Sequence, residues 1–460
     1  MGLVERLETR FDVHEHESSV RTEVLAGITT FLTMSYIVVV NPSILSAAIT
    51  IDGIPTAEVV SMLAIVTILS AAVATLIMAL YANRPFAQAP GLGLNAFFAF
   101  TVVGALGVPW QTALAAVVVE GLLFILLTAI GAREFIVRVF PAPVKFAVGT
   151  GIGLFLTIIG LEAMGIVVDD PATLVTLGAV ASDPIAIISL IGLFGTFIMY
   201  ARGVPGSIIL GILGTTALGW IAVTGGLFAA DSGLVAGPAT VAYDITPLAG
   251  AFLAGLGDIQ AFTFALIVFT FFFVDFFDTA GTIVGVGQAG GFLDDEGNLP
   301  DVDRPLMADA VGTTIGGALG TSTVTTYIES ASGVEAGGRT GLTALTVVAL
   351  FLVSLIFVPL ATVIPLYASH IALVVIGILM LRNVADIAWD DITVTIPAGL
   401  TILVMPFTYS IAYGIAAGII SYPLVKLAAG RTADLRPAHW ALAVAFVGYF
   451  IVQTGGVLTG

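Results

Sequence analysis

The sequence has no cysteine and few basic residues. Without cysteine, the chain can form neither a disulfide framework nor a thiolate metal site, which removes much redox chemistry. Lys and Arg together number 14 against 31 Asp and Glu, so the formal net charge is −17. In a soluble protein, such an excess of acidic residues would keep the surface hydrated and the protein soluble. Here we hypothesise an adaptation to high salt, as in a halophilic source; equal stability of the purified protein in dilute and molar salt would count against it.

Apolar residues are what the chain has in excess. Hydrophobic residues make up 58% of the sequence and charged residues 10%, and the mean hydropathy is +1.11. These values lie well outside the range of soluble globular domains. The 52 glycines suit helices that approach each other closely, since lipid provides no hydrophobic drive for helix contacts. The composition predicts an all-α polytopic membrane protein, which we place in the plasma membrane.

Gly, Pro and charged residues divide the apolar stretches into fourteen predicted membrane spans. An apolar run of about 20 residues crosses the hydrocarbon core as a helix. The first seven predicted spans lie near 22–48, 59–81, 92–104, 111–130, 144–165, 184–200 and 205–224. The second seven lie near 260–286, 305–318, 328–338, 341–358, 360–381, 391–407 and 409–427.

Positive charge tests this topology, because Lys and Arg concentrate in short cytoplasmic loops. With the N-terminal tail of residues 1–21 inside, all 14 basic residues fall on the cytoplasmic side, Arg133 and Arg138 among them. Shifting the topology by one span would break the pattern, so we predict a cytoplasmic N-terminus. The C-terminal segment 428–460 contains a further apolar stretch, 440–452. This stretch could be a fifteenth span, an interfacial helix or a segment packed against the bundle, and the sequence does not decide between them.

An odd number of spans in each half turns the second half upside down relative to the first. We therefore predict a 7+7 inverted repeat, with residues 22–224 as one half and 260–427 as the other. In third position each half has a short, glycine-broken segment, Gly91 to Phe98 and Gly320 to Ser330. The second is rich in β-branched residues, so we expect an extended stretch that enters a half-helix in each case (spans 3 and 10).

The two broken segments indicate a binding site at membrane depth. Irregular backbone survives there only where it is buried or lines a cavity, and paired interrupted helices in corresponding positions mark the sites of many transporters. Asn95 and Glu329 stand at the two breaks. The alternatives are structural: Glu329 could be a helix cap, and Asn95 a helix-breaking amide that satisfies local backbone groups.

Two carboxylates, Asp275 and Asp278, lie inside the apolar run 261–286. An Asp at a span centre costs roughly 2.5 to 3.5 kcal/mol even on mild scales, so it indicates function by default. Residues three apart lie on one face of a helix, and two neighbouring carboxylates cannot both ionise cheaply, so at least one is expected to carry a proton. The alternative is a structural carboxylic acid that bonds a neighbouring helix.

Four segments together resemble a known family. They are Thr22 to Ser43, Ala89 to Phe97 (APGLGLNAF), Asp275 to Thr282 (DFFDTAGT) and Gly320 to Leu342 (GTSTVTTYIESASGVEAGGRTGL). These segments resemble the AzgA-like purine permeases of the nucleobase-ascorbate transporter fold. The resemblance implies proton-coupled import of hypoxanthine, guanine or adenine. It also implies an elevator motion between a core domain (22–130 plus 260–358) and a gate domain (144–224 plus 360–427).

The same resemblance assigns roles to individual residues. It implies that Asn95, Asp275 and Glu329 bind the purine and that Asp278 is tied to proton coupling. The chemistry agrees, since carboxylates and an amide can bond the donor-rich edge of a flat base while apolar or aromatic groups hold its faces. Candidates for stacking are Phe97, Phe276 and Phe277, although packing is the simpler role for each.

Other functions fit less well. A xanthine or uracil permease is the nearest alternative, followed by an anion carrier of the same fold, which would need a basic residue at the site. An intramembrane aspartyl protease would need two Asp on facing helices, whereas Asp275 and Asp278 share one. We expect no catalytic residues, enzyme activity, cofactor, metal or nucleic-acid partner. The sequence does not decide whether the coupling ion is a proton or sodium, or which base is carried. It also leaves open whether the protein forms a homodimer in the lipid bilayer.

Overall fold

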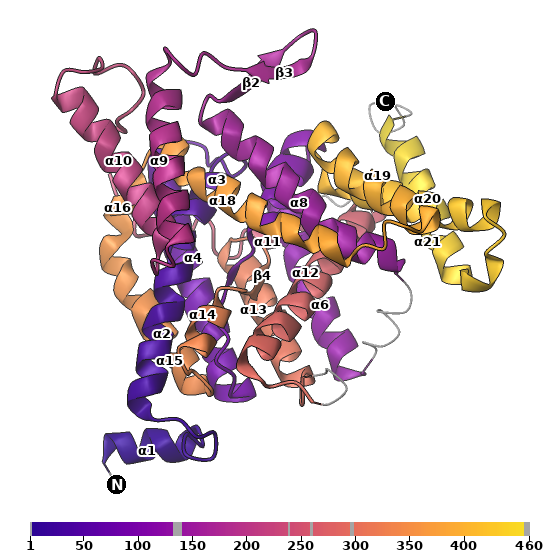
Figure 1. Ribbon diagram of the computed structural model, residues 1–460, viewed down its shortest axis with the longest axis horizontal. Helices are drawn as coiled ribbons and strands as arrows, with labels where there is room; N and C mark the ends of the chain where they lie inside the picture. The colour runs from indigo at the N-terminus through magenta and orange to yellow at the C-terminus, as the bar shows by residue number, and fades with distance from the viewer. Residues whose placement is uncertain (1, 132–139, 238–239, 258–260, 295–298, 455–460) are drawn as a thin grey trace.

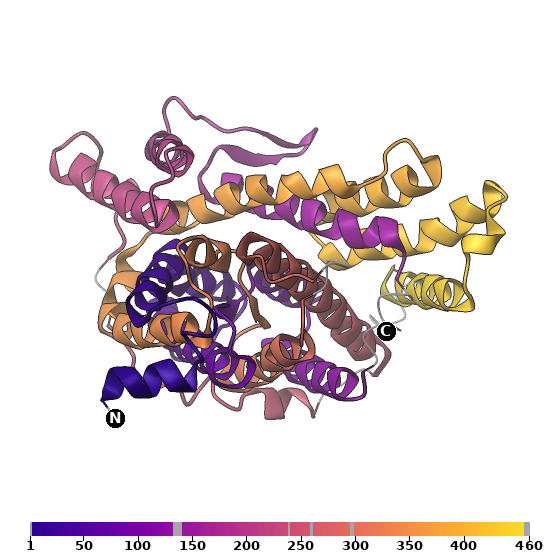
Figure 2. The same cartoon turned by 60° about the horizontal axis from the view of Figure 1, so that its bottom comes forward.

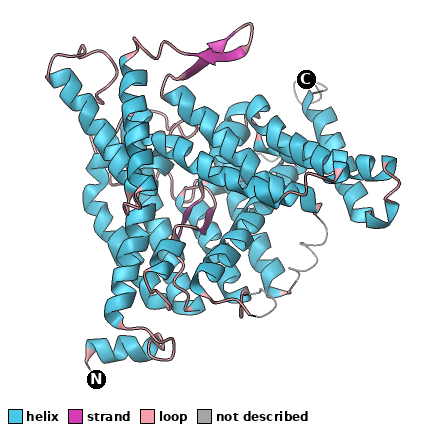
Figure 3. Ribbon diagram, viewed as in Figure 1, coloured by secondary structure: helices cyan, strands magenta, loops and turns pink. Residues whose placement is uncertain are grey.

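The computed structural model describes residues 2–131, 140–237, 240–257, 261–294 and 299–454. Arg133 and Arg138, two of the basic residues placed in cytoplasmic loops by the sequence, lie outside the described residues. The described chain is mostly helical (Figure 3). It has ten helical segments long and apolar enough to cross a membrane, and three shorter apolar ones at Leu92–Ala105, Ile392–Thr408 and Pro437–Gly448.

The N-terminal half contains most of the long helices (Figure 1). Its elements are α1 (Leu3–Arg10), α2 (Val20–Met34), α3 (Ile37–Leu45), α4 (Thr56–Ile77), η1 (Met78–Ala82), β1 (Gln88–Pro90), α5 (Leu92–Ala96), η2 (Phe97–Ala105), α6 (Trp110–Ala129), α8 (Ala142–Ala163), β2 (Val167–Asp170), β3 (Leu174–Leu177), α9 (Pro184–Ala201) and α10 (Ser207–Thr224). The strands β2 and β3 form an antiparallel hairpin outside the helices, so the acidic stretch 167–170 is a hairpin strand.

The C-terminal half contains α12, the helix that carries Asp275 and Asp278. Its elements are α11 (Phe252–Gly255), α12 (Ala261–Gly290), α13 (Asp303–Leu319), β4 (Val324–Thr326), α14 (Ser330–Glu335), α15 (Gly341–Ser354), η3 (Leu355–Phe357), α16 (Val358–Val363), α17 (Leu366–Ser369), α18 (Ile371–Met380), η4 (Leu381–Asp386), α19 (Ile392–Thr408), α20 (Ile411–Ala428), η5 (Thr432–Asp434) and α21 (Pro437–Thr454). The open stretch 440–452 is part of α21, which packs against α20 and α12.

Four predicted spans are not full-length apolar helices. The third and tenth contain only short helices after a strand, as expected for broken segments. The ninth and thirteenth correspond to α13 and α19, each 17 residues long. At a rise of about 1.5 Å per residue, a 17-residue helix is about 25 Å long, which is shorter than a hydrocarbon core of about 30 Å.

The helices pack in two groups. In the first, α8 packs against α18, α19 and α20, and α9 packs against α10. In the second, α13 packs against α4 and α6, α15 against α2 and α4, and α12 against α6. Figure 2 shows the purple α8 and the orange helices of the first group running side by side above the second group. Glycines allow close approach within both groups: a Cβ on Gly153 of α8 would meet the Gly377 carbonyl oxygen at 2.6 Å.

The two broken segments meet inside the second group as an antiparallel strand pair. Gln88 lies opposite Thr326, and Pro90 opposite Val324. All residues of both strands are buried. The pairing satisfies backbone groups that would otherwise be unpaired at membrane depth. A Cβ on Gly91 would lie 2.7 Å from Cγ2 of Thr325, so the close approach of the two segments requires glycine there.

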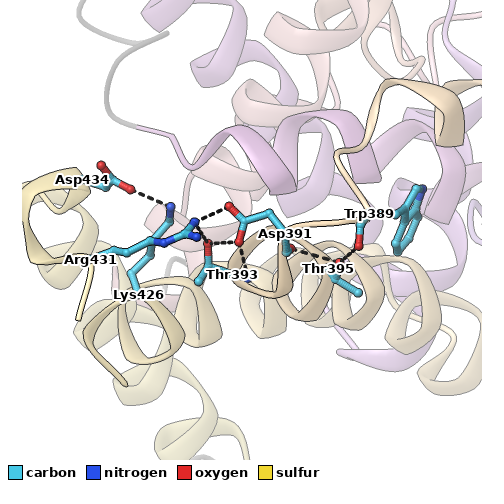
Figure 4. Close-up of polar contacts among 7 residues, drawn as sticks. All are labelled: Trp389, Asp391, Thr393, Thr395, Lys426, Arg431 and Asp434. Carbon is cyan, nitrogen blue, oxygen red and sulfur yellow. Dashed lines mark hydrogen bonds and ion pairs between the residues drawn. The ribbon is translucent and has the colours of Figure 1, made fainter. Parts of the chain in front are cut away.

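A polar cluster ties the start of α19 to the end of α20 (Figure 4). The carboxylate of Asp391 caps α19 by accepting from the backbone N–H of Thr393 at 2.9 Å, and it accepts from Nη1 of Arg431 at 2.5 Å. Beside it, Nζ of Lys426 donates to Asp434 at 2.7 Å. The hydrogen bonds from Thr393, with a smaller contribution from Arg431, lower the pKa of Asp391 to about 2.

Candidate functional site

Asp309 of α13 is the acceptor at the centre of the strand crossing. Its Oδ1 accepts from Nε2 of Gln88 at 3.0 Å and from Oγ1 of Thr326 at 2.9 Å, while Oδ2 accepts from Oγ1 of Thr279 at 3.0 Å. The side chain is fully buried. Asp309 therefore joins both strands and α12 through one carboxylate. The sequence interpretation did not single out Asp309, although an acid inside the predicted span 305–318 was a usable signal.

Asp275 lies beside this network and is also fully buried. Its Oδ1 accepts from Oγ1 of Thr279 at 3.5 Å, and Thr279 shares a 2.6 Å hydrogen bond with Thr325 of β4. Oδ2 of Asp275 has no hydrogen-bond partner among the described residues. Glu120, on the neighbouring helix α6, acts on Asp275 electrostatically. Asp275 is thus enclosed by protein groups and does not reach solvent in this conformation.

Glu120, on α6, is a second acid that the sequence interpretation missed. It is fully buried, and its Oε2 accepts from Oγ1 of Thr323 at 3.5 Å. Its Oε1 has no hydrogen-bond partner among the described residues. The available signal was an acid inside the apolar predicted span 111–130, which carries the same penalty that singled out Asp275.

Asn95 joins the first broken segment to the second. It lies in α5, fully buried, and its Oδ1 accepts a hydrogen bond from Oγ of Ser322. The bond crosses from one half of the chain to the other, so the amide oxygen of Asn95 does not serve local backbone. Its Nδ2 has no hydrogen-bond partner within the described part of the chain. An unpaired buried amide N–H carries a cost of roughly 1 to 3 kcal/mol, which a ligand can relieve.

Asp278 and Glu329 are the acids of the site that reach solvent. The Asp278 side chain is exposed, and Glu329 is partly exposed and acts on Asp278 electrostatically. One turn along α12, Gly281 has nothing within 4 Å of its Cβ position, and Gly285 lies 3.4 Å from Ile328 by the same measure. Because α12 packs against α14, this exposed face of α12 lies next to the start of α14, and we call this exposed region the accessible space.

The carboxylate of Glu329 is held from the turn between α2 and α3. Its Oε1 accepts a 2.5 Å hydrogen bond from the hydroxyl of Tyr36. Glu329 stands at the N-cap position of α14 but makes no side-chain cap hydrogen bond. The simple capping alternative does not describe its side chain, which is partnered by Tyr36 and borders the accessible space.

The three phenylalanines occupy packing positions. Phe97 is fully buried with its ring centroid 4.7 Å from that of Phe271, and Phe276 packs 5.6 Å from Phe124. Phe277 is partly exposed, and Nζ of Lys145 lies 5.3 Å from its ring centroid. Phe277 alone of these three combines an aromatic face with accessibility.

The described residues contain no group of three or more His, Cys, Asp or Glu that could hold a metal ion. The polar side chains at the strand crossing are carboxylates, hydroxyls and amides, which bond neutral polar ligands or protons. Helices broken by paired strands around a buried polar site define a membrane permease.

Comparison with known proteins shows the family. The Xan_ur_permease model, described as a permease family, matches residues 21–417. The chain belongs to this permease family, in agreement with its resemblance to the AzgA-like purine permeases. It is 40% identical over 448 residues to the adenine permease AdeP of Escherichia coli, covering 97% of this chain and 95% of that protein. It is 41% identical over 450 residues to the guanine/hypoxanthine permease PbuG of Bacillus subtilis, covering 97% and 99%. These relatives are permeases and not enzymes.

The fold also has a solved counterpart. The transmembrane domain of the cyanobacterial bicarbonate transporter BicA is similar with a TM-score of 0.60 and 14% sequence identity, covering 86% of this chain and 97% of that one. At this identity the likeness shows the fold alone.

Proposed function

We propose that this protein transports purine nucleobases across the plasma membrane by proton symport. The observation that carries the proposal is that two accessible acids, Asp278 and Glu329, lie beside the buried crossing of β1 and β4, where further carboxylates and amides from several helices gather. A purine base is neutral and rich in N–H donors and ring acceptors, so acids and an amide match its edge. The names of the relatives, adenine permease and guanine/hypoxanthine permease, support the same substrate class.

We place the base in the accessible space beside α12, with Asp278 and Glu329 bonding its edge. The support is that these two acids have accessible side chains on facing elements, while Asp275 is fully buried. The resemblance implied the opposite division, with Asp275 on the base and Asp278 on the proton. The geometry favours Asp278 for the base in this conformation. Asn95 would hold the strand crossing through Ser322 and offer its free N–H when the site reorganises.

The transport cycle we propose is an elevator motion within a 7+7 inverted repeat of 14 spans. The core would comprise 22–130 and 260–358, and the gate 144–224 and 360–427. The separate packing of α8 with α18 to α20, and of α13 with α4 and α6, supports this division. The N-terminus would be cytoplasmic; in support, Arg84 and Arg339 come from two predicted cytoplasmic loops and both lie over the ring of Phe292.

The test is uptake of radiolabelled hypoxanthine by cells that express the chain and lack their own purine permeases. Unlabelled adenine, guanine, xanthine, uracil and bicarbonate would compete in separate arms at two pH values. We expect competition by one or more purines, with faster uptake at the lower external pH. Competition by bicarbonate alone would replace the proposal by an anion carrier, and faster uptake with added sodium at fixed pH would replace the proton.

A further inference from the structure

Glu120 and Asp275 face each other from two different helices, α6 and α12, and neither reaches solvent. The two helices pack against each other, and Glu120 acts on Asp275 electrostatically. Oε1 of Glu120 and Oδ2 of Asp275 have no hydrogen-bond partner among the described residues. Two neighbouring buried carboxylates without donors at these oxygens cannot both ionise cheaply, so at least one of them carries a proton.

The groups around Glu120 and Asp275 indicate that these two carboxyl groups together hold one proton. Asp309 acts on both acids from α13, and Asp278 acts on Asp275 from the same helix. None of the ion pairs between described residues involves these acids. Asp309 receives three hydrogen bonds of 2.9 to 3.0 Å, whereas Glu120 and Asp275 each receive one from a threonine, at 3.5 Å.

The number of hydrogen-bond donors around each acid determines which of the three is ionised. A carboxylate with several donors is stabilised in its ionised form. Two adjacent anions without donors or a cation in a buried site are costly, because their repulsion is not screened by water. Asp309 is therefore the ionised member, and Glu120 and Asp275 share the proton.

We propose that Glu120 is a proton-coupling residue, which together with Asp275 binds the proton that moves with the substrate. This inference rests on the proposed function and adds a residue to it. Glu120 and Asp275 are fully buried, whereas Asp278 and Glu329, which border the accessible space in which we place the base, are exposed or partly exposed.

A short chain of contacts connects the proton pair with the base site. Thr323, which donates to Glu120, immediately precedes β4, and Thr325 within β4 bonds Thr279 of α12. Three residues after β4 the chain reaches Glu329, which borders the accessible space. Loss of the proton would leave two facing anions at the start of β4 and favour a different arrangement of this strand. Proton and base would then bind best to the same conformation, which is the condition for coupling.

Glu120→Gln is the decisive variant, because glutamine keeps the shape of the side chain and supplies a permanent N–H to Asp275. The experiment uses the purified full chain in proteoliposomes with radiolabelled hypoxanthine. An inward gradient of one pH unit can drive about a tenfold accumulation of a neutral base carried with one proton, since every 1.4 kcal/mol is a factor of ten. We expect Glu120→Gln to bind and exchange the base but to lose accumulation, so that inside and outside concentrations become equal.

The matched control is Glu58→Gln in the first turn of α4, where the same substitution should leave accumulation at the wild-type level. Accumulation by Glu120→Gln at the wild-type level and with the wild-type pH dependence would overturn the inference. Accumulation by the wild type in a sodium gradient at equal pH would also overturn it. If the wild type itself neither binds nor exchanges any base, the proposed function fails instead, and the two failures are distinguishable.

A second measurement covers the case in which Glu120→Gln does not fold. Infrared spectra of the wild type at neutral pH should show a protonated carboxyl C=O band that disappears in Asp275→Asn. A wild-type spectrum without such a band would contradict a shared proton. A band that stays unchanged in Asp275→Asn would place the proton on another acid and overturn the inference as well.

Discussion

Gln88 and Thr326, which lie opposite each other in the pairing of β1 and β4, donate to the same carboxylate oxygen of Asp309. One acid on α13 thus fixes the register of a strand pair formed by segments from the two halves of the chain. The pair has only three residues in each strand, so side-chain hydrogen bonds carry much of its geometry.

Removing this acid should destabilise the crossing. Asp309→Ala removes the acceptor of three buried hydrogen bonds, and a buried polar group left unsatisfied costs roughly 1 to 3 kcal/mol. We expect a clear loss of thermal stability in detergent and loss of base uptake. Asp309→Asn should be milder, because its amide oxygen still accepts. The control Asp52→Asn, at an exposed loop position, should unfold at the wild-type temperature. An unchanged melting temperature for Asp309→Ala would show that the network contributes little.

Gly91 should not tolerate a side chain. A Cβ at this position would lie 2.7 Å from Cγ2 of Thr325, and overpacking of this kind costs about 1 to 3 kcal/mol. We expect Gly91→Ala to lower both thermal stability and uptake. Gly195→Ala is the matched control, since a Cβ at Gly195 in α9 meets nothing within 4 Å, and alanine favours the helix. Equal behaviour of the two variants would argue against a close-packed crossing.

The hydrogen bond from Tyr36 to Glu329 should set the affinity for the base. Tyr36→Phe removes a hydroxyl that bonds a carboxylate at 2.5 Å, and hydrogen bonds to charged groups contribute about 1.5 to 3 kcal/mol. We expect KM for base uptake to rise about tenfold or more, with little change in the amount of folded protein. Tyr243→Phe, at an exposed tyrosine, serves as the control. An unchanged KM in Tyr36→Phe would remove Glu329 from the binding site.

The two aspartates of α12 should separate binding from coupling. Asp278→Asn changes the exposed acid, so we expect loss of base binding, measured by isothermal titration in detergent. Asp275→Asn changes the buried acid, so we expect binding to persist while proton-driven accumulation is lost. The reverse result, with binding lost only in Asp275→Asn, would restore the roles implied by the family resemblance.

The carboxylate of Asp391, which caps α19 and pairs with Arg431, should make the stability of the fold depend on pH. The pKa of Asp391 is lowered to about 2 by hydrogen bonds from Thr393 and by Arg431. A carboxylate whose folded pKa lies below its unfolded value of about 3.9 adds stability above that value and loses it as pH falls through about 2. Thermal unfolding between pH 5 and pH 2 should therefore show a steeper decline for the wild type than for Asp391→Asn. Parallel curves for the wild type and Asp391→Asn would mean that the carboxylate of Asp391 does not contribute to the stability of the fold.

The sequence by itself determined the membrane character, the two broken segments and the candidate acids Asp275, Asp278 and Glu329. These follow from local properties: long apolar runs, β-branched residues beside glycine, and the cost of a carboxylate in a span. Burial of Phe97 and Phe276 also follows from their apolar character. The count of long apolar helices was less predictable, because α13 and α19 are near the minimum length for a span.

Only the tertiary structure decided which of these groups meet. The rotation of α12 turns Asp275 toward α6 and leaves Asp278 exposed, and no spacing along the chain fixes that rotation. Glu120 and Asp309 become part of the site because α6 and α13 pack against each other beside α12. Contacts between residues from distant spans depend on helix packing and strand register, which arise from the whole fold and not from any local pattern.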